Sequence, residues 1–345
     1  QICNVTLSDD QWAQASLPVR CSGLGIRSVS MLAPSAFLAS AAGTQKLQLL
    51  ILRNCQVPVE DISSSEARWT FLFGTQTSTI MESSQRSLDS AVTGNSFQSL
   101  LDSRSDPVGQ ARLLAAAADH SGDWLHATPI TACGLRLDDE AIRVAVSIRL
   151  GLELCQVHQC NCGATIDTHG LHIFSCKRNS GRAQRHHFLN DLIWRAMTRA
   201  NIPSIKEPHG LARSDGKRPD GLTLIPWREG RSATWDVTVA DTLAASYVTS
   251  TSRCAAAAAE AAASRKETKY VDISRTHLFF PVAFETLGPI NQVGQEFISD
   301  LGRRISRVTD DPRESHFLFQ RLSVALQRFN AISFLLTFSL ANTTS

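Results

Sequence analysis

Residues 221–240 read GLTLIPWREGRSATWDVTVA, and this stretch decides the fold class of the 345-residue chain. Two apolar runs, Gly221–Trp227 and Ala233–Ala240, are rich in the β-branched and aromatic residues that favour strands, and a charged segment with a glycine separates them. A third strand candidate, Ser204–Leu211, lies just upstream. We therefore expect three consecutive short strands.

Helical patterns lie on both sides of these strands. The segment RAQRHHFLNDLIWRAMTRA (182–200) has apolar residues at a spacing that gives one buried helical face, and the alanine-rich CAAAAAEAAASRKETKY (254–270) is also expected to be helical. An apolar strand candidate, HLFFPVAFETLG (277–288), follows, and two further helices are expected at about 291–307 and 313–334. The predicted order is helix, three strands, helix, strand, which gives an α+β or α/β core with C-terminal helices.

The residues before this core, up to Gly151, predict helices and loops without a cluster of reactive side chains. SDPVGQARLLAAAAD (105–119) has Ser105 or Asp106 as a possible N-cap before an Ala/Leu-rich helical run. LDDEAIRVAVSIRLG (137–151) has acidic residues in its first turn and helical apolar spacing, and Gly151 is placed to end this helix. The serine-rich segment Ser63–Ser65 and the polar run Thr75–Ser99 are expected to be mobile.

The composition is that of a globular protein, with 43% hydrophobic and 19% charged residues. The formal net charge is only +2, so any attraction to nucleic acid has to come from a local patch. The most apolar segments, around Met31–Ala42 and Phe317–Phe338, are short or interrupted, and we expect no membrane span. No basic leader followed by an apolar run opens the sequence, so we expect no signal peptide and a piece of a longer chain.

Cysteine and histidine residues gather in CQVHQCNCGATIDTHGLHIFSCK (155–177). A structural zinc ion takes four tetrahedral ligands, often supplied as two short pairs. The pairs here are Cys160 with Cys162 and His172 with Cys176; the spare candidates, any of which could replace one of these, are Cys155, His158 and His169. The alternative is a loop of buried free cysteines with surface histidines. Four protein ligands leave no open position, so we expect the zinc to be structural.

Two carboxylates lie in the strand candidates. Asp220 follows Pro219 at the start of one, and Asp236 lies inside TWDVTV in the next. If these strands are neighbours, the two side chains repel each other unless a cation such as Mg²⁺ lies between them. The alternative for Asp220 is a turn aspartate, whereas Asp236, between Trp235 and Val237, is costly to bury without a partner.

A metal-dependent hydrolytic site also needs a nearby cation from the protein. Lys266 and Lys269 share one face of the alanine-rich helix and could reach the same edge, although either could equally lie on a solvated face. Glu207, at the end of the first strand candidate, is a further possible metal ligand or a solvated strand-end residue.

These residues together resemble the C-terminal part of a non-LTR retrotransposon polyprotein that carries a restriction-like endonuclease downstream of its reverse transcriptase. The resemblance rests on five segments: CNCGATIDTHGLHIFSC (160–176), RHHFLN (185–190), KRPDGLTL (217–224), TWDVTV (234–239) and RKETKY (265–270). Upstream, LPVRCSGLGIRSVSMLAPSAFLAS (17–40) and SGDWLHATP (121–129) resemble segments that follow the polymerase palm, so the similarity covers most of the chain.

The resemblance implies a role for each matched position. It implies a zinc knuckle at Cys160, Cys162, His172 and Cys176; an Arg-His-Asn element at Arg185, His186 and Asn190; a metal pair at Asp220 and Asp236; and helix-borne Lys266, Lys269 and Tyr270. It also implies a PD-(D/E)xK nuclease core, in which the lysine here lies on the helix rather than two residues after Asp236. No polymerase active-site motif is present, because LRLDDEAIR is better read as a helix start.

Basic residues cluster between the knuckle and the following helix. Lys177, Arg178 and Arg182 lie beside Arg185 and His186, and Arg213, Lys217 and Arg218 could extend this surface. Such residues could contact the phosphates of nucleic acid; the alternative is a solvated basic loop.

We therefore expect three regions: residues 1–152, a helical region that follows a missing reverse transcriptase; residues 153–180, the zinc knuckle; and residues 181–345, the restriction-like endonuclease. The expected activity is Mg²⁺-dependent nicking of double-stranded DNA in the nucleus, which leaves a 3′-hydroxyl primer for reverse transcription, with element RNA as a further partner and no membrane. Two alternatives stay open: an inactive nucleic-acid-binding fragment, and a structural scaffold without affinity for DNA.

Overall fold

The computed structural model describes residues 4–52, 62–73, 84–212 and 216–338. The chain divides into two compact units, Ser8–Arg104 and a larger unit of Ser105–Ser345 with the N-terminal segment Gln1–Leu7. The predicted divisions after residues 152 and 180 both fall inside the larger unit.

The smaller unit is helical. Its elements are α1 (Asp9–Ser16), the short 3-10 helix η1 (Val19–Cys21), α2 (Val29–Ile51), α3 (Ile62–Phe73) and α5 (Gln85–Ser103). A small apolar cluster of Leu38, Trp69, Leu88 and Val92 joins α2, α3 and α5. Of the two segments expected to be mobile, Ser63–Ser65 lies in α3 and residues 85–99 lie in α5, whereas residues 75–83 lie outside the described residues.

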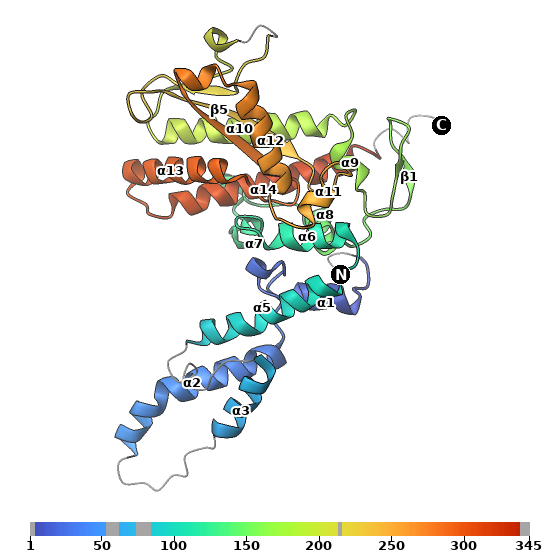
Figure 1. Ribbon diagram of the computed structural model, residues 1–345, viewed down its shortest axis with the longest axis vertical. Helices are drawn as coiled ribbons and strands as arrows, with labels where there is room; N and C mark the ends of the chain where they lie inside the picture. Colours follow the sequence, from blue (N-terminus) through green and yellow to red (C-terminus); the bar gives the residue numbers. More distant parts are fainter. Residues whose placement is uncertain (1–3, 53–61, 74–83, 213–215, 339–345) are drawn as a thin grey trace. The chain divides into compact units, whose positions relative to one another are not determined.

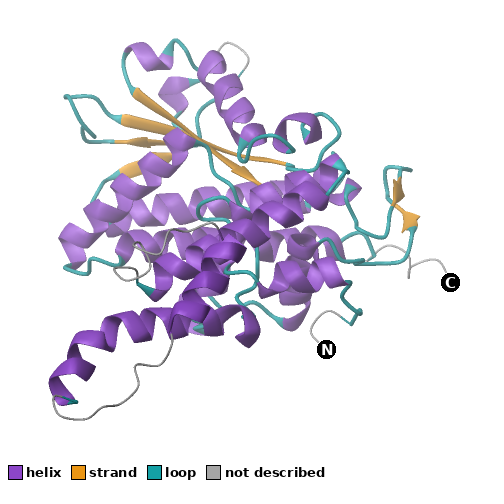
Figure 2. Cartoon of the chain, turned by 60° about the horizontal axis from the view of Figure 1, so that its bottom comes forward, coloured by secondary structure: helices purple, strands orange, loops and turns teal. Residues whose placement is uncertain are grey.

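The larger unit is a mixed α/β structure, which confirms the predicted general class (Figures 1 and 2). Its helices are α6 (Pro107–Ala117), α7 (Asp123–His126), α8 (Asp139–Leu150), α9 (His172–Ser175), α10 (Gly181–Arg199), α11 (Val248–Thr251), α12 (Ala257–Lys269), α13 (Gln292–Thr309) and α14 (Glu314–Leu335), with the 3-10 turns η2 (Thr131–Cys133), η3 (His209–Leu211) and η4 (Ile273–Arg275). Its strands are β1 (His158–Gln159), β2 (Thr165–Ile166), β3 (Ser204–Lys206), β4 (Gly221–Thr223), β5 (Ala233–Ala240) and β6 (Leu278–Glu285).

The strands form two sheets. β1 and β2 make a two-stranded antiparallel hairpin, and the other four lie in the order β3-β4-β5-β6. The first two pairings in this sheet are antiparallel, whereas β5 and β6 run parallel over their full length, from Ala233 opposite Leu278 to Ala240 opposite Glu285. A parallel pair needs a crossover, and α12 lies in that connection. The predicted order of helix, three strands, helix and strand is therefore present.

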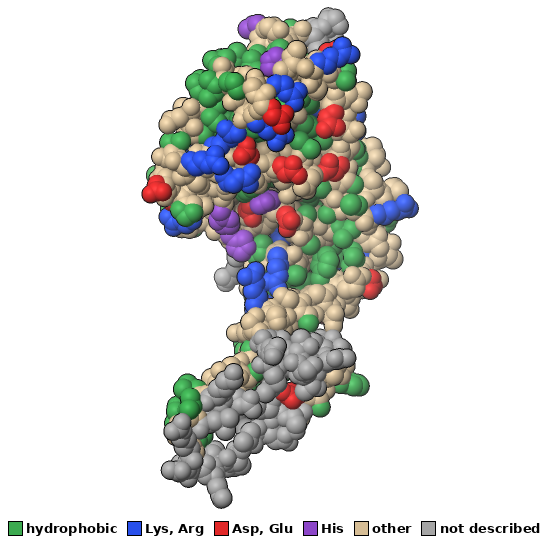
Figure 3. Space-filling view, turned by 60° about the vertical axis from the view of Figure 1, so that its left-hand side comes forward, with side chains coloured by type: hydrophobic (Ala, Val, Ile, Leu, Met, Phe, Trp, Pro, Cys, Tyr) green, Lys and Arg blue, Asp and Glu red, His purple; other side chains and the backbone are tan. Residues whose placement is uncertain are grey.

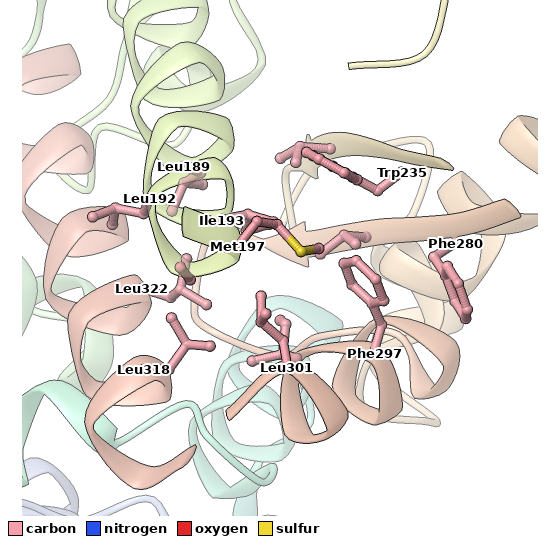
Figure 4. Close-up of a cluster of buried hydrophobic side chains, with 14 of the residues drawn as sticks. Leu189, Leu192, Ile193, Met197, Trp235, Phe280, Phe297, Leu301, Leu318 and Leu322 are labelled. Atoms are coloured by element: carbon pink, nitrogen blue, oxygen red, sulfur yellow. The ribbon is translucent and has the colours of Figure 1, made fainter. Parts of the chain in front are cut away.

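Helices cover both faces of the larger sheet, and the core differs between them. On one face, side chains of α10, α13 and α14, among them Phe297 of α13, pack against Trp235 and Phe280 of the sheet in a large apolar cluster (Figure 4). On the other face, α12 packs its alanines against Ala240 and Ala283. Small side chains let this helix approach the sheet closely, which explains why its sequence is a run of alanines.

Two of the predicted strands are shorter than expected. β3 ends at Lys206 because Glu207 has a φ of +46° and Pro208 follows it, and neither continues a strand. β4 ends at Thr223, and Pro226, which has no N–H, lies in the connection to β5. Gly221 in β4 is required by packing, because a Cβ there would lie 2.0 Å from the ring of Trp235.

The longest helices, α2 and α14, do not have the character of membrane spans. Pro34 interrupts the apolar run of α2, and α14 carries Arg321 and Arg328. Within the described residues, no helix combines the length and the apolar character that crossing a bilayer requires.

Candidate functional site

Asp220 and Asp236 lie side by side on neighbouring strands. The antiparallel register pairs Gly221 with Trp235, so Asp220 lies opposite Asp236 just beyond the last pair of the ladder. The backbone N–H of Asp220 donates to the carbonyl of Trp235 at 2.9 Å, and the N–H of Val237 donates to Asp220 Oδ2 at 2.6 Å. The structure thus brings together the two carboxylates that the sequence singled out.

The two acids are close enough to influence each other electrostatically. Burial is the main cause that raises the pKa of Asp236, whose side chain is only 4% exposed, and the charge of Asp220 raises it further. Lys266 and the Tyr270 hydroxyl act in the opposite direction without reversing the shift. A second positive charge at this position would be favourable, because it would relieve both the burial and the repulsion.

Of the two candidate lysines, Lys266 contacts the acids. Its Nζ lies 2.5 Å from Asp236 Oδ1. Lys269, three residues further along α12, donates instead to the Tyr270 hydroxyl at 2.8 Å. The same hydroxyl donates to the carbonyl of Arg218 at 2.8 Å and also interacts with Asp236. The geometry therefore favours Lys266 over Lys269 as the lysine of this site.

His186 and Asn190, one turn apart on α10, hold the Asp220 side of the site. His186 Nε2 lies 3.0 Å from Asp220 Oδ2. Asn190 Oδ1 accepts the indole N–H of Trp235 at 2.8 Å, and its amide lies 3.4 Å from the carbonyl of Asp220. Burial lowers the pKa of His186, but the hydrogen bond and charge of Asp220, with the charge of Asp236, outweigh it and leave the pKa raised. Both residues support the carboxylates from within the fold.

Arg185 does not lie on the surface where a phosphate contact was expected. Its side chain is 1% exposed, and Nη1 donates to Asn330 Oδ1 of α14 at 2.5 Å. Burial lowers the pKa of this guanidinium to about 10. The expectation for Arg185 is corrected accordingly: the residue ties α10 to α14 and is not accessible to a ligand here.

Glu207 also lies apart from the carboxylate pair. Its side chain is 55% exposed, and Oε2 pairs with Arg218 Nη2 at 2.8 Å. Only its backbone approaches the site, where the N–H donates to the carbonyl of Asp220 at 3.1 Å. Its contacts match the reading of a solvated strand-end residue. Of the other basic positions predicted nearby, Arg213 lies outside the described residues.

The cysteine and histidine cluster is assembled as the sequence predicted. The ligand atoms of Cys160, Cys162, His172 and Cys176 all lie within 4.8 Å of one another, and this set could hold a metal ion such as zinc. Cys160 Sγ and Cys176 Sγ are 3.6 Å apart, and Cys162 Sγ and His172 Nε2 are 3.1 Å apart. Adjacent ligands of a tetrahedral zinc site lie roughly 3.5 to 3.8 Å apart, given bonds of about 2.0 to 2.3 Å. The Cys160–Cys176 separation falls in this range, and the Cys162–His172 pair would have to open slightly around an ion.

The local backbone explains how Cys160 and Cys162 reach one point with a single residue between them. Gly163 has a φ of +89°, and its N–H donates to the carbonyl of Cys160 at 2.8 Å to close the turn. A backbone N–H bond at Ala164 is the first cause that lowers the pKa of Cys162, to about 6, whereas burial raises that of Cys160, to about 11. The Cys162 thiolate is therefore available near neutral pH to start metal binding.

The spare ligand candidates lie elsewhere. The thiol of Cys155 contacts the carbonyl of Asp167, and His158 Nε2 lies 3.2 Å from Thr337 Oγ1 at the end of α14. His169 contacts its neighbour Thr168. The structure therefore selects one set of four from the seven candidate ligands.

A basic depression lies between the knuckle and the carboxylate pair. It has a volume of about 360 Å³, and its basic lining residues are Lys177, Arg178, Arg182 and His186, with the buried Arg185 behind them. Arg178 donates to the carbonyl of Asn161 and Arg182 to the carbonyl of Ser175, both at 3.0 Å, so the knuckle backbone holds two of these side chains. On the face shown in Figure 3, by contrast, basic and acidic side chains lie interspersed. The basic depression is thus a local feature, as the low net charge requires.

The sequence reasoning missed two parts of this region. One is the role of Asn190 as a tie between β4 and β5, which needs knowledge of the strand register. The other is Glu285, the last residue of β6, which lies buried beside Asp241. A charged residue that ends the apolar run HLFFPVAFE was the available signal for it.

Comparison with known proteins adds no relative to these observations: none of the protein-family models matches the chain, and a search of curated proteins finds no significant match.

Proposed function

We propose that this protein is a Mg²⁺-dependent endodeoxyribonuclease with a PD-(D/E)xK-like core. The observation that carries the proposal is the convergence of Asp220, just before β4, with Asp236 of β5 and Lys266 of α12. The order α10, β3, β4, β5, α12, β6 and the mixed sheet are compatible with such a core. The wider resemblance to retrotransposon endonucleases supports the same assignment.

The donor set suits a divalent cation. Asp220 and Asp236 offer hard carboxylate oxygens of the kind that Mg²⁺ prefers, and they repel each other without one. Bound there, Mg²⁺ would activate water and stabilise the charge that develops on a phosphodiester. His186 and the N–H of Val237 both contact Oδ2 of Asp220 and so orient this carboxylate.

Lys266 supplies the fixed positive charge of the site. Its ammonium favours the ionised form of Asp236, because it lowers a pKa that burial raises. An ammonium has three donors, so the group that holds Asp236 can also donate to the attacking water or to a phosphate oxygen. This is the role that the resemblance implies for a lysine displaced onto the helix.

The basic depression provides a route for the DNA backbone to the carboxylates. Lys177, Arg178 and Arg182 lie on the knuckle side, and His186 belongs to both the depression and the site. Phosphate contacts of this kind fix a duplex in register without reading its sequence. We propose that a structural zinc ion in the knuckle keeps Arg178 and Arg182 in place through their bonds to Asn161 and Ser175.

The biological role that we propose follows the resemblance alone. The nuclease would nick double-stranded target DNA in the nucleus and leave a 3′-hydroxyl that primes reverse transcription of element RNA by a polymerase domain upstream of residue 1.

The test is plasmid nicking with and without Mg²⁺. Wild-type protein should convert supercoiled DNA to the open circle, and Asp220→Asn and Asp236→Asn should abolish nicking while the affinity for DNA stays within about twofold. Asp272→Asn is the matched control, because the Asp272 carboxylate is exposed and pairs with Arg275 rather than with a residue of the candidate site. Nicking that survives both active-site changes would refute the assignment.

One observation favours a second function, which is nucleic-acid binding without cleavage. Each carboxylate already has a basic partner from the protein, Asp220 with His186 and Asp236 with Lys266. A site balanced in this way can be stable without a metal ion. This function predicts salt-sensitive DNA binding through the basic depression and no effect of Mg²⁺ on the topology of the plasmid.

A further inference from the structure

The helix that carries Lys266 has no cap of its own. The residue before α12, Ala256, has a φ of +63° and offers no side chain to the free N–H groups of the first turn. Glu285, from the end of β6, takes this role: its Oε1 accepts the N–H groups of Ala258 at 2.9 Å and Ala259 at 3.2 Å. A carboxylate at a helix N-terminus is favoured both by these bonds and by the helix dipole.

Glu285 is fully buried, and a polar network lies around the end of β6 that carries it. Asp241, which follows β5, lies close enough to raise its pKa, although burial is the larger cause. Thr286 Oγ1 donates to Asp241 Oδ1 at 3.1 Å, and the carbonyl of Thr286 accepts from Asn330 at 2.7 Å. Asn330 in turn accepts from Arg185, the neighbour of His186 on α10. The network therefore links the elements that carry His186, Asp236 and Lys266.

The packing of α12 gives a reason why this cap matters. The face that α12 turns to the sheet consists of Ala258, Ala259, Ala262 and Ala263, and it meets Ala240 and Ala283. Methyl groups on both sides interlock weakly, so they resist sliding and rotation of the helix less than large side chains do. Lys266 lies eight residues beyond Ala258, or about 12 Å along the axis, and a shift by one residue would turn it by about 100°.

We propose that Glu285 is a positioning residue for Lys266. By capping α12 from the neighbouring strand, it fixes the axial position and rotation of the helix and thereby places the ammonium group against Asp236. This inference rests on the proposed function for its catalytic consequence, but the placement of Lys266 can be measured without activity.

The experiment compares Glu285→Ala and Glu285→Gln with Glu260→Gln in the full chain. Glu260 is a matched control, since it lies in the first turn of the same helix but accepts the N–H of Gln292 at the start of α13. One readout is the rate at which a trace acylating reagent labels Lys266, relative to Lys177, in protein without Mg²⁺ or DNA. The other is the kcat and KM of plasmid nicking with Mg²⁺.

We expect Glu285→Ala to raise the labelling of Lys266 and to lower kcat, each by about tenfold, with KM within about twofold, because an N-cap is lost. Glu285→Gln keeps one acceptor oxygen and should fold even if the alanine variant does not; a change of about threefold is expected. Glu260→Gln should leave both readouts unchanged. In a Lys266→Ala background, Glu285→Ala should change kcat by less than about twofold, since the two residues act on one step.

Each result has one reading. Unchanged labelling of Lys266 in folded Glu285→Ala and Glu285→Gln would overturn the inference, and so would a loss of kcat that is fully additive with Lys266→Ala. If wild-type protein does not nick DNA but the labelling changes as expected, the proposed function fails and the positioning of Lys266 by Glu285 stands.

Discussion

Replacing Lys266 with alanine tests the electrostatics of the candidate site. The Lys266 ammonium lies 2.5 Å from Asp236 Oδ1, and the two side chains are 25% and 4% exposed. Two unit charges about 4 Å apart attract by roughly 4 kcal/mol at the effective dielectric of a protein site. Solvent screens part of this attraction, because the lysine side chain is partly exposed. Without Lys266 the cost of burying the Asp236 carboxylate remains. The free energy of unfolding should therefore fall by about 2 to 3 kcal/mol at neutral pH.

The pH dependence makes this prediction specific. Burial and Asp220 already raise the pKa of Asp236, and loss of Lys266 removes an effect that lowers it. A carboxyl whose native pKa exceeds its unfolded value destabilises the fold when ionised, and this cost disappears as the pH falls through the native pKa. The destabilisation by Lys266→Ala should therefore be largest at about pH 7.5 and shrink toward about pH 4.5, near the ordinary carboxyl range.

The assay is urea unfolding at several pH values in EDTA, with Lys269→Ala as the control. Lys269 lies one turn away on the same helix, and its ammonium donates to the Tyr270 hydroxyl rather than to Asp236. Its loss should cost about 1 kcal/mol or less, with a smaller pH dependence than the loss of Lys266. Equal losses for the two variants, or a loss for Lys266→Ala that does not change with pH, would refute the reasoning.

Three further predictions concern the metal ions and DNA. Mg²⁺ should raise the melting temperature more at about pH 7.5 than at pH 5, because binding needs ionised carboxylates, and Asp220→Asn should remove most of this gain in scanning calorimetry. Purified protein should contain one zinc ion per chain by elemental analysis; Cys176→Ala should lose it, whereas Cys155→Ala should keep it, and a zinc content unaffected by Cys176→Ala would exclude the assigned site. Arg178→Ala with Arg182→Ala should reduce the slope of log affinity for DNA against log salt by up to about 1.8, and an unchanged slope would remove these residues from the interface.

The sequence predicted the central secondary structure where pattern and local signals agree. α8 begins after the Asp138 cap and ends at Gly151 in the left-handed conformation, as the residue types require. β5 has the predicted bounds, because Ala233–Ala240 is rich in strand-forming residues, with Asp236 as the exception, and lies mostly buried between two helical layers. Local physical chemistry was sufficient at these positions.

Other features depend on tertiary contacts that no local pattern reports. Arg185 was expected on the surface because it lies in a basic segment, but α14 covers it and supplies Asn330 as its acceptor. The choice between Lys266 and Lys269 depends on the rotation of α12 on the sheet, which a spacing of three residues cannot fix. The cap that Glu285 provides requires the parallel pairing of β5 and β6 across residues far apart in the sequence.

The most direct test of the central claim is anomalous diffraction at the manganese edge from crystals soaked in Mn²⁺ at about pH 7.5. The proposed site predicts a manganese peak between Asp220 and Asp236, with Lys266 beside it, and no such peak in crystals of Asp236→Asn. If Mn²⁺ bound only elsewhere, or if Asp220 and Asp236 shared no ion at saturating Mn²⁺, the proposed site would be contradicted.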